Sequence, residues 1–195
     1  PTEFPNIGKI QPITEFKINQ KKLSQIFQRT LFAMSQQDVR YYLNGILLEI
    51  TRDSIKAVAT DGHRLAMNNL SAKNSTGQKI QAIIPRKAIL QLTKILNSSE
   101  GDVMLSIGAS FLRASCDTYT FTTRLIDGRY PDYNRVIPKQ ANRDITLKTL
   151  DFKQALQRSA ILCNEKFSGI KLELNKDTLK IHANNPEHEA AEEEL

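Results

Sequence analysis

The sequence is poor in the residues that most catalytic and metal sites require. Its 195 residues include two cysteines, Cys116 and Cys163, which are far apart and outside any metal-ligand spacing. We expect free thiols in a reducing cytoplasm rather than a disulfide. The three histidines, His63, His182 and His188, form no HxH or HExxH motif, so no zinc site is expected. No nucleophile stands in a recognisable catalytic setting, and we predict no catalytic residue, no metal and no cofactor.

Long apolar runs are also missing. None approaches the roughly 18 residues that span a bilayer. Residues 1–5 lack the charged and apolar segments of a secretory leader, and there is no initiator methionine. We therefore expect a cytoplasmic protein without a membrane segment. The length suits one complete domain followed by part of another.

What the sequence does have is positive charge. It contains 27 Lys and Arg residues against 21 Asp and Glu residues, a formal net charge of +6. Five of the acidic residues crowd the last nine positions, so the rest of the chain is more basic than the total indicates. This balance favours a polyanionic partner. The acidic end itself is typical of a solvated or disordered tail.

The sequence also repeats itself. Residues 16–30 match residues 145–159 without a gap, and residues 45–50 match residues 169–174. A fainter match relates residues 18–30 to residues 84–96 through apolar spacing. We therefore predict three similar halves at about 14–70, 80–130 and 143–195.

Each half is predicted to form a short strand, a helix and then several strands. Apolar residues recur at helical spacing in 20–34, 85–96 and 150–163, with Asn19 as an N-cap of the first helix. Strands are expected at 46–50, 55–59, 103–107, 111–115, 118–124, 170–174 and 178–183. The fold class is therefore α+β, with repeated strand–helix–strands halves, antiparallel sheets and few helices.

The polar sides of these helices are almost purely basic. They hold eight Lys or Arg residues against one carboxylate, Asp151. A solvated helix surface is usually mixed in charge. A surface facing a polyanion explains the bias better, because Lys and Arg bind backbone phosphates without reading bases.

Four segments carry a family resemblance: QDVRYYLNG at 37–45, ATDGHRLA at 59–66, LIDGRYPDY at 125–133 and NEKF at 164–167. In order and spacing they resemble the β subunit of bacterial DNA polymerase III, the sliding-clamp family. The resemblance implies a linker at 1–13, a complete middle domain of two similar halves at 14–138, and a linker with the first half of the third domain at 139–195. It implies sheets outside and helices lining a concave surface, in a ring that encircles duplex DNA and catalyses nothing.

The resemblance and the helix charges together give three sets of candidate residues. Contacts to duplex DNA are expected from Lys22, Arg29, Gln37, Arg40, Tyr41, Tyr42, Arg86, Lys87 and Lys94. A groove for linear peptide motifs of the polymerase catalytic subunit, the clamp loader and repair polymerases is expected at Leu43, Thr60, Gly62, His63, Arg64, Leu65, Pro131, Arg135, Val136 and Phe167. An interface with a second clamp subunit is expected at Ile161, Leu162, Phe167, Glu187, Glu189, Glu192 and Glu193.

Part of the three-domain subunit lies outside this resemblance, so we expect that the chain alone does not close a dimeric ring. Two other function classes stay open. One is a sequence-independent nucleic-acid-binding module, which would hold linear DNA tightly. The other is a metal-dependent nuclease, for which the glutamates near the end are too local to converge on a metal.

Overall fold

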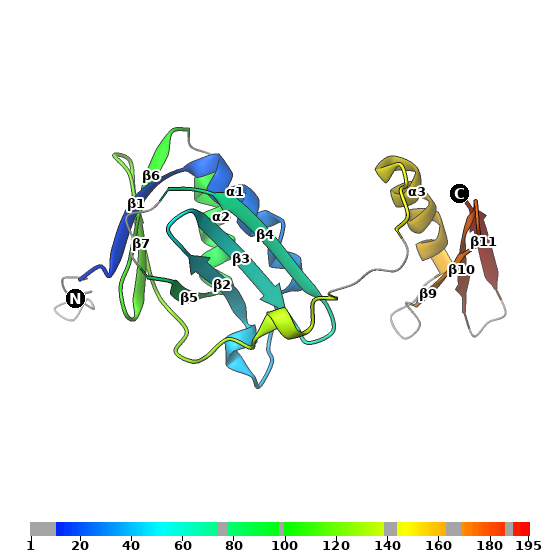
Figure 1. Cartoon of the computed structure of the whole chain (residues 1–195), viewed down its shortest axis with the longest axis horizontal. Coiled ribbons are helices and arrows are strands. Elements are labelled where there is room, and N and C mark those ends of the chain that lie inside the picture. Colours follow the sequence, from blue (N-terminus) through cyan, green and yellow to red (C-terminus); the bar gives the residue numbers. More distant parts are fainter. Residues whose placement is uncertain (1–10, 74–77, 98–99, 139–143, 163–168, 186–188) are drawn as a thin grey trace, which may run out of the picture. The chain divides into compact units, whose positions relative to one another are not determined.

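The structure is a computed structural model that describes residues 11–73, 78–97, 100–138, 144–162, 169–185 and 189–195 (Figure 1). The chain divides into two compact units, Pro1–Tyr133 and Asn134–Leu195. Each unit has its own sheets and its own apolar core, and each is described separately.

The first unit repeats one order of elements. The first copy comprises β1 (Thr14–Asn19), α1 (Gln20–Gln28), β2 (Gly45–Ile50), β3 (Ser54–Thr60) and β4 (Leu65–Ser71). The second copy comprises β5 (Ile80–Pro85), α2 (Arg86–Asn97), β6 (Asp102–Ile107), β7 (Phe111–Ser115) and β8 (Thr120–Arg124). β5 and α2 begin 66 residues after β1 and α1, which is the spacing of the fainter sequence repeat.

The two copies exchange their first strands. β1 pairs antiparallel with β6 of the second copy, which gives a sheet of order β1-β6-β7-β8. β5 pairs antiparallel with β2 of the first copy, which gives a sheet of order β4-β3-β2-β5. The pairing starts at Gly45, where a Cβ atom would overlap the carbonyl oxygen of Ile84. A residue without a side chain is therefore needed at this approach of β2 to β5.

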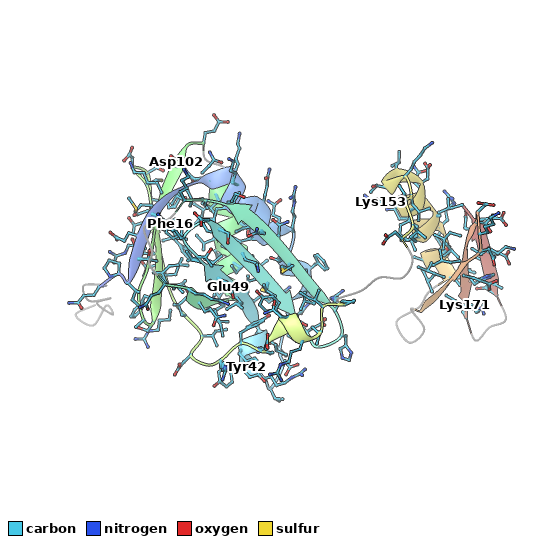
Figure 2. All side chains as sticks on the ribbon, in the orientation of Figure 1. Phe16, Tyr42, Glu49, Asp102, Lys153 and Lys171 are labelled. Atoms are coloured by element: carbon cyan, nitrogen blue, oxygen red, sulfur yellow. The ribbon has the colours of Figure 1, made fainter. Side chains whose placement is uncertain are left out.

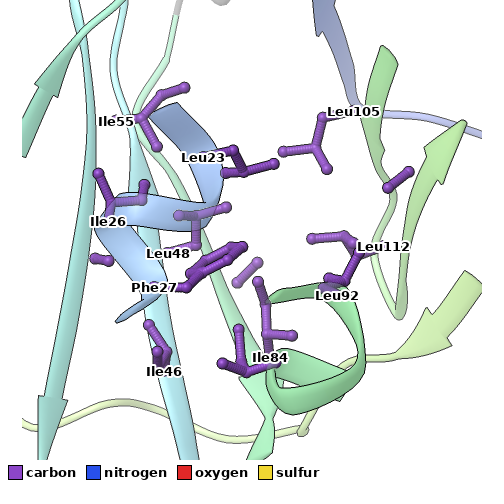
Figure 3. Packing of buried hydrophobic residues seen from close by; sticks show 14 of the residues in the cluster. Leu23, Ile26, Phe27, Ile46, Leu48, Ile55, Ile84, Leu92, Leu105 and Leu112 are labelled. Atoms are coloured by element: carbon purple, nitrogen blue, oxygen red, sulfur yellow. The ribbon is translucent and has the colours of Figure 1, made fainter. Parts of the chain in front are cut away.

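One apolar core joins both copies (Figure 3). Leu23 and Phe27 of α1, Leu92 of α2, Leu48 of β2 and Leu105 of β6 have no exposed surface. Burying a side chain of this size contributes about 1.5–3 kcal/mol. The core thus unites two helices and two sheets, and the α+β class with antiparallel sheets predicted from the sequence is confirmed.

The first helix is shorter than predicted. The capping role of Asn19 is confirmed, because its Oδ1 accepts from the Lys22 N–H at 3.1 Å. The predicted end at residue 34 is wrong: α1 ends at Gln28, and a 3-10 turn, η1 (Leu31–Ala33), follows. The Thr30 hydroxyl donates to the carbonyls of Ile26 and Phe27. These bonds occupy carbonyls at the end of the helix, while Leu31 and Ala33 of η1 stay packed on the core.

The second unit contains α3 (Thr149–Ser159), a 3-10 turn η4 (Ala160–Leu162), β9 (Ile170–Leu174), β10 (Leu179–Asn184) and β11 (Ala190–Glu194). The sheet order is β11-β10-β9, and all pairs are antiparallel. Its core consists of Ala155, Leu179 and Ile181, with partly buried neighbours. The acidic end, whose composition is also typical of a solvated tail, forms the edge strand β11.

The predicted strand before α3 is absent from the described residues. Residues 144–148 lie in coil, although they match β1 in the repeat. In the first unit, the equivalent strands β1 and β5 each pair with the sheet of the other copy. A strand at this position of the repeat therefore forms against a second copy and not against its own. Leu172 and Leu174 show the same difference: they are 48% and 49% exposed, whereas their repeat equivalents in β2 are fully buried.

Candidate functional site

Both helices of the first unit expose basic side chains. Lys22 is exposed on α1 and Arg29 is exposed at its C-cap; the two lie two turns apart and so project from one side of that helix. Lys87 and Lys94 have the same spacing on α2 and are also exposed. Neither helix contains an Asp or Glu residue. Since α1 and α2 bury their apolar sides in one core, their basic sides face away from that core.

Two residues beside these positions make contacts of their own, Lys21 through its side chain and Arg86 through its backbone. Lys21, next to Lys22, has its Nζ 2.6 Å from Glu100 Oε1. Arg86 is half-buried at the first residue of α2, and its backbone N–H donates to the Asn44 carbonyl at 2.9 Å. The start of α2 is thereby tied to the loop before β2.

That loop, residues 37–44, carries the other predicted DNA contacts. Asn44 closes it, because its side chain accepts from the Asp38 N–H and donates to the Asp38 carbonyl, both at 2.9 Å. Gln37 is exposed. A 3-10 turn, η2 (Tyr41–Leu43), sets the Tyr41 and Tyr42 rings edge to face, with centroids 5.9 Å apart.

The exposure of the loop differs along its length. Tyr41 is 57% exposed, Tyr42 is half-buried (Figure 2), and Leu43 is buried under the loop. Val39 is 96% exposed, which sequence reasoning missed. An apolar residue at the tip of a polar loop gives no periodic signal by which it could have been found.

Arg40 does not extend freely from this loop. Its Nε and Nη2 donate to the two carboxylate oxygens of Asp38 at 3.0 and 2.8 Å. Hydrogen bonds from the Arg40 side chain and backbone lower the pKa of Asp38 to about 2. Nη2 also lies 3.5 Å from the carbonyl oxygen of Asp61, so Arg40 joins loop 37–44 to the segment that follows β3.

Residues 60–65 form a tight loop between β3 and β4. The Thr60 hydroxyl donates to the Arg64 carbonyl at 2.7 Å and accepts from the Gly62 N–H at 3.1 Å. The Asp61 carboxylate accepts from the backbone N–H groups of His63 and Arg64, both at 3.0 Å. These backbone bonds lower the pKa of Asp61. Asp61 therefore shapes the loop, and neither catalysis nor a metal is needed to explain it.

Of the other predicted groove residues in the first unit, Leu65 begins β4 and Pro131 is exposed. Pro131 follows Tyr130, whose hydroxyl accepts from the Thr60 N–H at 3.1 Å. Burial raises the pKa of Tyr130 to about 12. The segment that carries Pro131 is thus held at the end of β3, beside loop 60–65.

A buried polar cluster on β2 holds the same segment further along, and sequence reasoning missed it. Glu49, which is labelled in Figure 2, is 5% exposed. Its carboxylate accepts from Gln81 at 3.0 Å and from Lys79 at 2.6 Å. The Tyr133 hydroxyl donates to Glu49 Oε1 at 3.3 Å, and Lys56 Nζ lies 3.4 Å from that hydroxyl. Burial opposes ionisation of Glu49, but the bonds from Lys79 and Gln81 prevail and its pKa is lowered.

The remaining candidates fall in the second unit or outside the described residues. Arg135 ends a 3-10 turn, η3 (Tyr133–Arg135), and both Arg135 and Val136 are exposed. Ile161 is 79% exposed and Leu162 is half-buried in η4. Phe167 and Glu187 lie outside the described residues, as does Cys163.

Three of the predicted interface acids, Glu189, Glu192 and Glu193, already have partners within the second unit. Glu193 is bound by Arg158 through Nε and Nη2 at 2.6 and 2.8 Å. Glu192 lies 2.9 Å from Lys180 Nζ. The Glu189 side chain accepts from the Asn185 amide at 2.6 Å. The charges of Glu192 and Glu193 are therefore already partly balanced within the unit.

Within the residues that the structure describes, no group of three or more His, Cys, Asp or Glu side chains is placed to hold a metal ion. Across the same residues, no helix is both long and apolar enough to cross a membrane. Cys116 is a free thiol. The features that remain as candidates for function are the polar loops 37–44 and 60–65 and the basic sides of α1 and α2.

Comparison with known proteins assigns the family. The model of the DNA polymerase III β subunit central domain matches residues 17–132, and that of its C-terminal domain matches residues 134–195. The chain belongs to the DNA polymerase III β-subunit family. The beta sliding clamp of Pseudomonas aeruginosa is 46% identical over 193 residues, which cover 99% of this chain and 53% of that clamp. The clamp of Escherichia coli K12 is 42% identical, over 99% of this chain and 52% of its own length.

Solved β-subunit structures share the fold. The DNA polymerase III subunit beta of Pseudomonas aeruginosa has a TM-score of 0.93 at 45% identity, covering 100% of this chain and 53% of that one. The sliding clamp of Bacillus subtilis has a TM-score of 0.91 at 28% identity, covering 100% of this chain and 52% of that one. The clamp fold expected from the resemblance is confirmed. This chain spans about half the length of the relatives it matches.

Proposed function

We propose that this chain forms the central domain and part of the C-terminal domain of a DNA sliding clamp, a non-catalytic protein that encircles duplex DNA and tethers replication and repair enzymes to it. The observation that carries the proposal is the exposed basic sides of α1 and α2, which bear Lys22, Arg29, Lys87 and Lys94 and no carboxylate. The family assignment supports the same reading.

The basic sides of α1 and α2 suit a DNA duplex that slides relative to the protein. Phosphate attraction is long-range, independent of sequence and weakened by salt. Lys and Arg side chains can bind backbone phosphates without reading the base sequence. Contacts of this kind hold the duplex inside a ring while leaving it free to slide, so persistence comes from topology rather than from affinity.

Loop 60–65, with Leu43 and Pro131, is proposed as one wall of a groove for linear peptide motifs. Leu65 and the exposed Pro131 supply apolar surface, and Leu43 is buried beneath the neighbouring loop 37–44. Hydrogen bonds between the side chains of Thr60 and Asp61 and the backbone keep loop 60–65 in one shape. Such a site binds aliphatic and aromatic anchors and orients them with polar groups at its rim. The partners proposed are the polymerase catalytic subunit, the clamp loader and repair polymerases. A Pseudomonas aeruginosa clamp has been solved bound to griselimycin, which supports ligand binding by clamps of this kind.

Topological retention on DNA tests the proposal. We would replace the matching half of the Pseudomonas aeruginosa clamp by residues 1–195 and load the chimera onto nicked circular DNA with that organism's clamp loader. The chimera is expected to stay on the circle at salt concentrations that abolish phosphate contacts, and to leave when a restriction enzyme linearises the DNA. The unmodified Pseudomonas aeruginosa clamp is the control.

Two outcomes would contradict the proposal. Retention on linear DNA at low salt, with release from circles at high salt, would indicate an ordinary nucleic-acid-binding module. Cleavage of the DNA by the 195-residue chain in the presence of Mg²⁺ would indicate a nuclease. Either result would leave the basic helices without a role in sliding.

A further inference from the structure

Arg40 was expected to contact DNA, yet its guanidinium group lies against the loop proposed for peptides. The Asp38 carboxylate accepts two parallel hydrogen bonds from it, at 3.0 and 2.8 Å. A Cβ atom built on Gly62 would lie 3.1 Å from Arg40 Nη2 and 3.4 Å from Nη1. The guanidinium plane therefore occupies the space that a side chain at residue 62 would fill.

Gly62 is required here for two reasons. Its φ of +91° lies in a region that residues with a side chain rarely adopt. Its missing side chain also lets Arg40 approach the loop backbone and reach the Asp61 carbonyl at 3.5 Å. The neighbouring Tyr41 ring lies against Gly128 in the same way, with ring atoms 3.4 Å and more from the position of a Cβ. Loop 37–44 thus braces both segments of the proposed groove wall.

The same geometry makes Arg40 a poor ligand for phosphate. Asp38 is ionised at neutral pH, because its pKa is about 2. A phosphate that approached Arg40 would meet this carboxylate, which repels it and already uses one edge of the guanidinium group. Lys22, by comparison, is exposed on a helix without any carboxylate.

We propose that Arg40 is a positioning residue that holds loop 60–65 in its peptide-binding shape, and that it does not bind DNA phosphate. The proposal deepens the proposed function, since it rests on loop 60–65 being the peptide site. It separates two roles that the sequence assigns to one loop: Arg40 and Tyr41 support the groove, while Gln37 and Tyr42 stay available to DNA.

Three variants of the 195-residue chain test this role: Arg40→Ala, Arg40→Lys and Asp38→Asn. Arg40→Lys keeps the charge but loses the planar fork. The first measurement is the ¹H–¹⁵N resonance of Gly62, which needs no ligand. It is expected to move in all three variants, while the resonances of α1 and the melting temperature stay at their wild-type values. A Gly62 resonance unchanged in Arg40→Ala would overturn the proposal.

The second measurement compares two ligands, using the clamp chimera described above. One is a fluorescein-labelled peptide with a leucine and a phenylalanine anchor, and the other is a labelled duplex titrated at several salt concentrations. All three variants are expected to bind the peptide about tenfold more weakly, as loss of a charged hydrogen-bonded brace implies. The salt dependence for DNA of the two Arg40 variants should stay unchanged, whereas Lys22→Ala should lower the slope by about 1.

The opposite pattern identifies a phosphate ligand. In that case Arg40→Ala lowers the salt slope as Lys22→Ala does, Arg40→Lys restores it, and peptide binding is unaffected; the positioning role would then be wrong. If the wild-type chimera binds no peptide while Gly62 still responds to Arg40, the proposed groove fails and the bracing of loop 60–65 stands.

Discussion

The hydroxyl group of Tyr133 donates a hydrogen bond of 3.3 Å to Glu49, a residue 84 positions earlier in the chain. This contact fastens the last residue of the first unit to its sheet β4-β3-β2-β5. Glu49 can serve as an anchor because Lys79 and Gln81 compensate its buried charge, with Lys56 close by. The point at which the chain leaves the first unit is therefore fixed by one carboxylate.

The anchor gives a first prediction. Glu49→Gln is expected to lower the free energy of unfolding by about 2 kcal/mol, because the buried carboxylate is replaced by an amide that attracts the Lys79 ammonium less and has one acceptor oxygen instead of two. Urea unfolding followed by far-UV circular dichroism measures it. Glu173→Gln is a matched control, since Glu173 holds the same place in the repeat but its side chain is 44% exposed. Equal losses in both variants would show that burial of Glu49 contributes nothing.

The same residue predicts a pH dependence. The folded-state pKa of Glu49 is lowered from an ordinary value of 4.5. The stabilisation from its ionised form is therefore fully present above that value and is lost as pH falls through the lower folded-state pKa. The difference in unfolding free energy between wild type and Glu49→Gln should be largest near neutral pH and shrink in acid. If this difference in unfolding free energy grows on acidification, the pKa of Glu49 is raised in the folded state and the assigned direction is wrong.

A third prediction concerns the close approach of β2 and β5. Gly45→Ala should destabilise the first unit by about 2 kcal/mol or more, because the new methyl group overlaps the Ile84 carbonyl and forces the strands apart. Gly169 occupies the matching repeat position and has no atom within 4 Å of a Cβ. Gly169→Ala should consequently be neutral. Thermal unfolding of the two variants decides between a steric cause and a general effect of glycine replacement.

A fourth prediction compares adjacent lysines on α1. Lys22→Ala should reduce the salt dependence of DNA binding by about one unit in the slope of log affinity against log salt concentration. Lys21→Ala should change it less, because Lys21 is paired with Glu100 at 2.6 Å. Fluorescence anisotropy with the clamp chimera measures both slopes. Identical slopes for the two variants would contradict the prediction that pairing with Glu100 reduces the contribution of Lys21 to DNA binding.

Local sequence carries much of this fold. The spacing of Leu23, Ile26 and Phe27 predicts α1, and the same spacing recurs where α2 and α3 form. Buried positions are restricted to apolar residues of suitable size, so the repeat remains visible in them. β4 was missed because Asn68 and Asn69 interrupt the apolar alternation and are unfavourable in strands.

Contacts between distant residues could not be predicted in this way. The family resemblance predicted that Arg40 contacts DNA, and an arginine beside two tyrosines is chemically suited to that role. Its contact with Gly62 depends on how two loops meet, and the link from Glu49 to Tyr133 depends on how the chain crosses a sheet. The resemblance supplied the list of candidate residues, but only coordinates could show that Glu193 is already bound by Arg158.

The exchange of β1 and β5 leaves the first unit without a place at which it can be divided. Cutting the backbone between β4 and β5 would yield two pieces that remain paired. The first piece contributes β1 to the sheet of the second, and the second contributes β5 to the sheet of the first. The first unit is therefore expected to unfold as a whole, and a substitution that destabilises one sheet should also destabilise the other. The two copies are consecutive in the sequence, but their exchanged strands resemble those of a strand-swapped dimer whose two chains are joined by a peptide linker.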